Sequence, residues 1–108
     1  MARLRDVTVD REQIRDSVLD LLGPYGVTRI AIFGSCARGE QTDESDLDIL
    51  VRMEEPRRGS LGFRWFRIEH ELSERLGRRV EIVTEECLSK YVRPYVQEDE
   101  IVLYDAAR

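Results

Sequence analysis

Lysine and histidine are nearly absent from this chain, and no long apolar run occurs in it. Lys90 is the only lysine and His70 the only histidine among 108 residues. His70 lies between glutamates without a partner motif, so we do not expect it to be a general base. Nothing at the N-terminus resembles an apolar signal sequence, and no segment could span a membrane. We therefore expect a cytoplasmic protein without a membrane partner.

Cysteine is also scarce. Cys36 and Cys87 lack the close spacing of zinc ligands, and two cysteines do not form a disulfide framework. In the cytoplasm both thiols are expected to be reduced. The cysteines therefore indicate neither a metal centre nor a disulfide-stabilised fold.

Positive charge is limited as well. The formal net charge is −5, which argues against a dedicated nucleic-acid binder, because affinity for phosphate backbones comes mainly from clustered positive charge. We expect no direct binding of duplex nucleic acid. The arginines between positions 57 and 79 indicate either a solvated helix face or a local basic patch.

The remaining composition is that of a globular protein. Hydrophobic residues make up 42% and charged residues 36% of the chain. A chain of this length buries roughly two thirds of its unfolded surface but is too short for two independent cores. No repeat or linker divides it, so we expect a single domain over residues 1–108; whether it forms a homo-oligomer is left open.

Hydrophobic periodicity and turn residues predict the secondary structure. The predicted elements, in chain order, are a helix over 10–22 capped by Asp10 or Thr8 and stopped at Gly23-Pro24, a strand over 29–33, a helical turn over 36–38, a strand over 45–51, a helix over 61–76 capped by Ser60 and ended by Gly77, a strand over 79–84, a less regular helix over 86–97 interrupted at Pro94, and a closing strand over 101–104. This order predicts an α/β (α+β) fold. We expect a small mixed sheet of three or four strands, with helices packed on one face and the other face open.

Paired carboxylates on a strand are the main chemical signal. Asp46 and Asp48 alternate with Leu47 and Ile49, so both should project from one face with their bases roughly 6 to 7 Å apart. Two such carboxylates can share divalent cations, and Mg²⁺ completes its shell with waters and substrate phosphates. By alternation alone, an exposed sheet face explains the pair equally well. Glu81 is the best candidate for a third carboxylate, from a neighbouring strand.

A glycine and a serine after the first strand add to this signal. Gly34 allows a close approach of backbone to phosphate, and the hydroxyl of Ser35 can bond a phosphate oxygen. Arg38 is a candidate for contacting phosphate or for anchoring the turn through a salt bridge. Ser45 is a candidate for nucleotide binding or for capping the loop. Together these residues would form a triphosphate site beside the acids.

Two runs, Phe33–Gly39 (FGSCARG) and Ser45–Val51 (SDLDILV), resemble the signature of the DNA polymerase beta nucleotidyltransferase superfamily. Within it, the short chain and the Gly-Ser-x-x-Arg-Gly form resemble the minimal nucleotidyltransferase (MNT) proteins. The resemblance implies that Gly34 and Ser35 bind triphosphate and that Asp46 and Asp48 bind Mg²⁺, with two ions expected. Glu81 would take the place of a third acid that is usually aspartate.

The resemblance also implies a partner. MNT proteins of this size often act as antitoxins beside a HEPN-family toxin, and some transfer AMP from ATP to its tyrosines. The hypothesis is therefore a protein adenylyltransferase. One alternative is a non-catalytic antitoxin that neutralises its partner by binding it. A second alternative is transfer to a small molecule or an RNA end, which the missing substrate domain and the acidic net charge disfavour.

Overall fold

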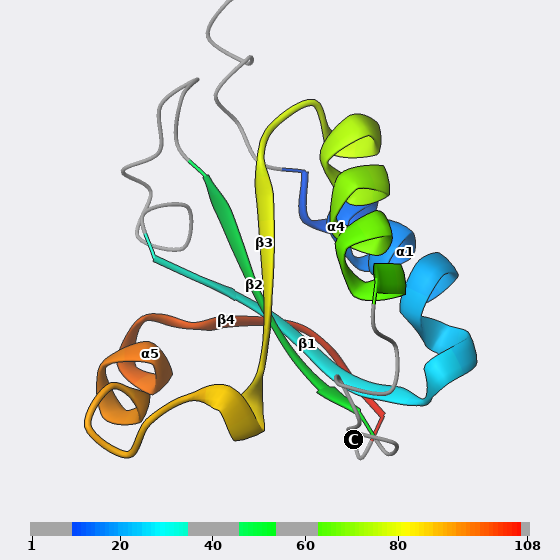
Figure 1. The fold of residues 1–108 in the computed structure, drawn as a ribbon. Helices are drawn as coiled ribbons and strands as arrows, with labels where there is room; N and C mark the ends of the chain where they lie inside the picture. Colours follow the sequence, from blue (N-terminus) through cyan, green and yellow to red (C-terminus); the bar gives the residue numbers. More distant parts are fainter. Residues whose placement is uncertain (1–9, 35–45, 54–62, 107–108) are drawn as a thin grey trace, which may run out of the picture.

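The computed structural model describes residues 10–34, 46–53 and 63–106. Its centre is a four-stranded sheet in the order β3-β2-β1-β4 (Figure 1), formed by β1 (Val27–Phe33), β2 (Leu47–Met53), β3 (Val80–Thr84) and β4 (Ile101–Asp105). β1 pairs antiparallel with β2 and with β4, whereas β2 and β3 are parallel. The sheet is therefore mixed and open at both edges. The helical turn over 36–38, the caps Thr8 and Ser60 and the turn over 57–60 lie outside the described residues.

α1 (Arg11–Leu22) begins and ends close to the predicted boundaries. Asp10 caps it, because its side chain accepts a hydrogen bond from the Gln13 backbone N–H. The stop differs from the prediction. Gly23 keeps a right-handed helical conformation and starts a short 3-10 helix, η2 (Gly23–Tyr25), and the left-handed residue is Gly26, with φ of 81°. Pro24 fits the first turn of η2, where its missing N–H costs nothing.

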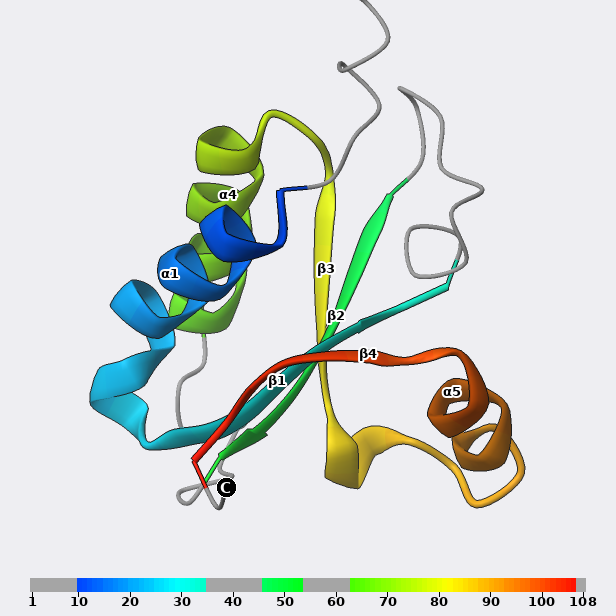
Figure 2. The same cartoon turned by 180° about the vertical axis from the view of Figure 1, so that it is seen from behind.

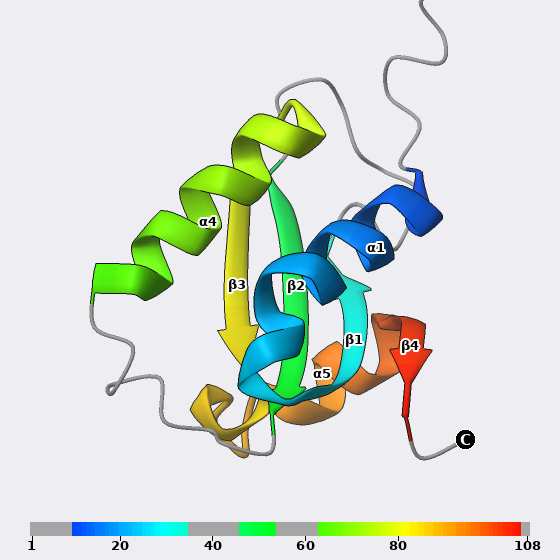
Figure 3. The ribbon, with the colours of Figure 1, turned by 90° about the vertical axis from the view of Figure 1, so that its right-hand side faces the viewer.

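α4 (Phe63–Leu76) is the second helix on the same face (Figure 3). Trp65, Ile68 and Leu72 are buried at spacings of three and four, so one stripe of the helix meets the sheet. Gly77 ends it with φ of 70°, as predicted. Trp65, Ile68 and Leu72 belong to the main core, together with residues of α1 and of all four strands. This core lies between the helices and the sheet.

The opposite face of the sheet is partly covered, where the sequence predicted an open face. α5 (Arg93–Asp99) lies over it, away from α1 and α4 (Figure 2). Val96 of α5 packs on Ala31 of β1 and Leu50 of β2, which forms a second, smaller core. The predicted interruption at Pro94 is wrong, because Pro94 stands in the first turn of α5. The segment before it holds a short 3-10 helix, η3 (Glu85–Cys87).

Within the described ranges, each helix is too short or too polar to cross a bilayer.

Candidate active site

The two strand carboxylates lie on the face of the sheet that carries α5. On β2, Leu47, Ile49 and Val51 are buried toward α1 and α4, while Asp48 is half-buried on the other side. Asp46 immediately precedes β2 and is exposed. The alternation therefore gave the correct face for Asp48. Leu50 and Arg52 follow Asp48 along the same face, so the acids occupy one end of it.

Glu81 lies next to Asp48. The parallel register places Asp48 of β2 directly opposite Glu81 of β3. Glu81 is exposed between the buried Val80 and Ile82, so its side chain projects from the same face as Asp48. Glu81 therefore neighbours Asp48, and the charges of both Glu81 and Asp46 act on Asp48.

Gly34 lies beside Asp48 on the side away from Glu81, because β1 and β3 flank β2. It follows β1 with φ of 78°, a conformation that side-chain-bearing residues rarely adopt. A Cβ atom built on Gly34 would lie 2.7 Å from Oδ2 of Asp48. The Asp48 carboxylate therefore rests against the glycine backbone, which only a hydrogen atom at this position permits. Ser35, Arg38 and Ser45 lie outside the described residues.

The electrostatics of this cluster favour a cation. Burial raises the pKa of the Asp48 carboxyl group, and the negative charges of Glu81 and Asp46 raise that pKa further. Among the described residues, no group of three or more histidine, cysteine, aspartate or glutamate side chains meets as closely as an all-protein metal site would. Mg²⁺ does not require such a group, because it usually binds one or two carboxylates and keeps waters or phosphates in its shell.

Two residues of α4 hold the third acid in place, and the sequence analysis missed them. β3 is an edge strand, so alternate N–H groups point away from β2. The N–H of Ile82 donates to Oε2 of Glu69 at 2.9 Å, and the N–H of Val80 donates to Oγ of Ser73 at 3.0 Å. Glu81 is thus fixed between two anchored neighbours. The available signal was the spacing of Glu69 and Ser73, four apart on the helix preceding the strand.

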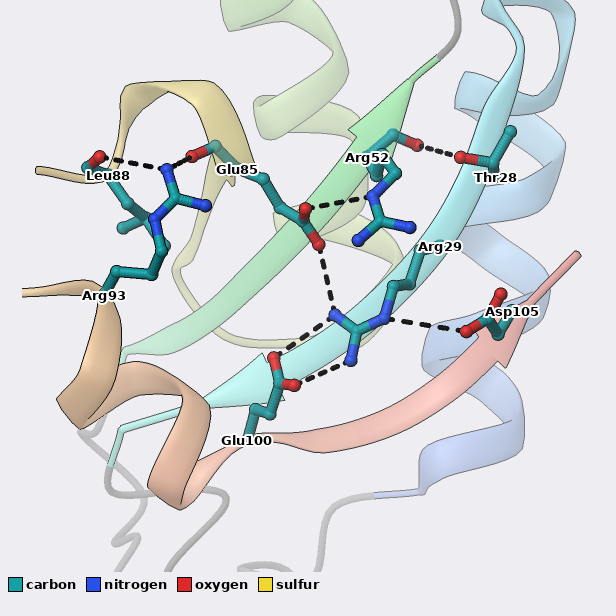
Figure 4. Close-up of polar contacts among 8 residues, drawn as sticks. All are labelled: Thr28, Arg29, Arg52, Glu85, Leu88, Arg93, Glu100 and Asp105. Atoms are coloured by element: carbon teal, nitrogen blue, oxygen red, sulfur yellow. Dashed lines mark hydrogen bonds and ion pairs between the residues drawn. The ribbon is translucent and has the colours of Figure 1, made fainter. Parts of the chain in front are cut away.

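A polar cluster occupies the other end of the same face (Figure 4). Arg29 of β1 pairs with Glu100 at 2.6 Å, with Glu85 at 3.2 Å and with Asp105 at 3.7 Å. Arg52 also pairs with Glu85, at 3.0 Å. Through these ion pairs the cluster joins β1, β2, η3 and β4, and it is a structural feature of the face.

The small mixed sheet, with α1 and α4 on one face and with α5, carboxylates and a strand-ending glycine on the other, matches the polymerase-beta-like nucleotidyltransferase fold. The chain belongs to the nucleotidyltransferase domain family, whose model matches residues 11–103, and it is a nucleotidyltransferase of the minimal type.

Individual relatives agree with this assignment. A protein of Methanocaldococcus jannaschii, provisionally named a protein adenylyltransferase, is 39% identical over 90 residues, which cover 82% of this chain and 89% of the relative. A solved structure described provisionally as a minimal nucleotidyltransferase is 38% identical and covers 86% of this chain and 95% of its own, with a TM-score of 0.65.

A third comparison extends the likeness of fold. A tri-AMPylated Shewanella oneidensis HEPN toxin in complex with an MNT antitoxin matches with a TM-score of 0.65 at 17% identity. The match covers 89% of this chain and 73% of the other. At that identity the likeness concerns the fold alone.

Proposed function

We propose that this chain is an antitoxin that transfers AMP from ATP to a tyrosine hydroxyl of a HEPN-type toxin. One observation carries the proposal: Asp48 is held between the backbone of Gly34 and the carboxylate of Glu81, at the open end of a sheet face. This arrangement places a phosphate-compatible backbone beside cation-binding oxygens. The names of the relatives, a protein adenylyltransferase and an AMPylated HEPN toxin bound to an MNT antitoxin, support AMP as the transferred group and a protein as the acceptor.

The residues have distinct roles in this proposal. Gly34 and Ser35 bind the triphosphate, and Arg38 and Ser45 are candidates for further contacts to the nucleotide. Asp46, Asp48 and Glu81 are the metal ligands. Glu81 lies on the acceptor side and accepts the proton that the attacking hydroxyl loses. The hydroxyl oxygen forms a bond to the α-phosphorus, and pyrophosphate leaves.

Mg²⁺ fits this donor set. Burial, together with the negative charges of Glu81 and Asp46, raises the pKa of Asp48, so a bound cation would offset both the burial of this charge and the repulsion. All three side chains offer the oxygen ligands that Mg²⁺ prefers. When bound, the ions, of which we expect two, neutralise charge on the phosphates and hold the reacting oxygens in line.

The deciding experiment uses α-labelled ATP, Mg²⁺ and the purified product of the neighbouring gene. Wild type is compared with the Asp46→Ala, Asp48→Ala variant and with Glu12→Ala, Asp16→Ala, which removes two exposed acids from α1. We expect label on the partner with wild type and with the α1 variant. No label should appear when Asp46 and Asp48 are replaced.

The opposite outcome is equally informative. If none of the proteins transfers label, yet all form a tight complex with the partner, the chain is a non-catalytic antitoxin. If label appears with the Asp46→Ala, Asp48→Ala variant, the acids do not carry the reaction and the assignment of the site is wrong.

A further inference from the structure

α1 and α4 cover one face of the sheet (Figure 3). A groove lies between them, on the side opposite the face that carries Asp48. Its volume is about 360 Å³. The residues lining it are Leu21, Tyr25, Arg64, Arg67, Ile68 and Glu71. Those from α4 recur at spacings of three and four, so they form one stripe of the helix that faces the end of α1 and η2. The groove is thus a feature of the helical layer and is separate from the acids.

The floor of the groove is apolar. Ile68 is buried, and Leu21 and Tyr25 are half-buried and pack against the main core. Phe63, one turn before Arg67 on α4, is 85% exposed. Interface cores are enriched in aromatic residues and arginine, and grooves with an apolar floor and a few polar groups are common binding sites. These features suit a protein segment that inserts an apolar side chain.

The rim of the groove carries the positive charges of Arg64 and Arg67. Arg29, Arg52 and Arg75 each have a carboxylate partner. Over the part of the chain that the structure describes, Arg64 and Arg67 are exposed and lack one. Glu71, at the end of the groove, is already paired with Arg75 at 3.1 Å. In a chain of net charge −5, two neighbouring arginines without a carboxylate partner among the described residues form a local basic patch that complements carboxylates.

We propose that this groove binds an acidic amphipathic segment of the partner protein. The apolar side chains of the segment would rest on Leu21, Tyr25 and Ile68, and its carboxylates would pair with Arg64 and Arg67. Arginine is suited to this because its guanidinium can bond a carboxylate through two parallel N–H groups. The identity of the partner rests on the proposed function. Because the groove and Asp48 lie on opposite faces of the sheet, holding the partner and modifying it are separable.

RNA is the competing occupant, since arginine also pairs with phosphate. The acidic net charge of the chain disfavours it, because nucleic-acid affinity depends on extended positive surface. The apolar floor also offers a phosphate backbone little to contact. A protein segment uses both the charged rim and the floor.

The test reverses the two charges. The Arg64→Glu, Arg67→Glu variant is compared with Arg11→Glu, Arg79→Glu, which changes the net charge equally at exposed positions outside the groove. Affinity for the purified partner is measured by calorimetry at low and high salt, with thermal unfolding as the check on folding. We expect the groove variant to bind at least about tenfold more weakly and with less salt dependence. The control should stay within about twofold, and ATP binding should be unchanged in both.

A milder variant, Arg64→Gln, Arg67→Gln, removes the charges without reversing them and should give an intermediate loss. Equal weakening by the groove variant and its control would trace binding to overall charge and overturn the proposal. Unchanged partner affinity, with loss of binding to a labelled RNA, would replace the protein segment by nucleic acid. A wild-type protein that binds its partner through the groove but transfers no AMP would refute the proposed function and leave this inference intact.

Discussion

Asp48 illustrates how a single residue can serve a site at a cost to the fold. Its carboxyl group is half-buried against Gly34, beside Glu81 and Asp46, and its pKa is raised. The folded chain therefore holds this proton more tightly than the unfolded chain does. The stabilisation from this difference is complete below the unfolded pKa, at about pH 4, and is lost as the pH rises through the folded value. At neutral pH the ionised side chain opposes folding.

Asp48→Asn tests this prediction, because it removes the charge and keeps the shape. We expect the variant to melt above wild type at pH 7, with the difference shrinking toward about pH 4. Mg²⁺ should raise the melting temperature of wild type more than that of the variant, because a ligand that binds only the folded state stabilises it. Thermal unfolding followed by circular dichroism measures both effects, with Asp16→Asn on α1 as the control. A difference that grows as the pH falls would contradict the sign of the shift.

Secondary-structure elements are joined on the acid-bearing face by side chains from distant parts of the sequence. Arg29 of β1 binds Glu85, which follows β3, Glu100, which follows α5, and Asp105 of β4 (Figure 4). Its side chain is 15% exposed and the three acids are 13 to 19% exposed. Hydrogen bonding to Glu100 raises the pKa of the Arg29 guanidinium, so the guanidinium stays charged. The cluster therefore sets the position of α5 and β4.

Arg29→Met should destabilise the protein, because Glu100 and Asp105 lose their ion pair with Arg29 and Glu85 keeps only the pair with Arg52. Breaking a well-buried pair costs about 3 to 5 kcal/mol, and we expect about 2 kcal/mol here because the cluster retains some contact with water. Urea unfolding measures the loss. Arg75→Met, which removes the exposed pairs with Asp20 and Glu71, is the control and should have little effect. Equal losses in the two variants would show that the Arg29 cluster behaves like an ordinary surface network.

Elements with one buried face could be predicted from the sequence. α1, β1, β2, α4 and β3 lie close to their predicted positions, because each repeats apolar residues at the period of a helix or strand. The position of α5 could not be predicted. Its contact with Ala31 and Leu50 uses Val96 as its only fully buried residue, too little to create a periodic signal. Pro94 was misread for the same reason, since a short helix gives few residues against which to place a first turn.

In the candidate site, too, the features that follow a local pattern could be predicted and those that depend on tertiary contacts could not. Asp46 and Asp48 are recognisable because strand alternation is local. The contact of Gly34 with Asp48 depends on how β1 and β2 pair, and the support of β3 by Glu69 and Ser73 depends on how α4 lies along the sheet edge. Such contacts follow from tertiary packing, so the spacing of Glu69 and Ser73 alone does not show which backbone groups they bind.

At the scale of the whole molecule, the two faces of the sheet are packed unequally. α1 and α4 bury a large core on one face, including Trp65 and Leu72, whereas α5 buries a small one on the face that carries Asp48. Regions with few buried apolar contacts open at lower free energy than the core. The acid-bearing face should therefore be the more easily opened half of the structure.

Two substitutions, one in each core, test whether the two faces of the sheet open independently. Leu72→Ala in the main core should cost about 2 to 5 kcal/mol and raise amide hydrogen exchange throughout the sheet. Val96→Ala in the small core should cost about 1.5 kcal/mol, because it removes roughly two buried carbon groups. Its effect on exchange should be confined to α5 and β4, with α1 and α4 unchanged. Uniform acceleration in the Val96 variant would show that the two cores unfold as one unit, and α5 could then not move independently of the helices that line the groove.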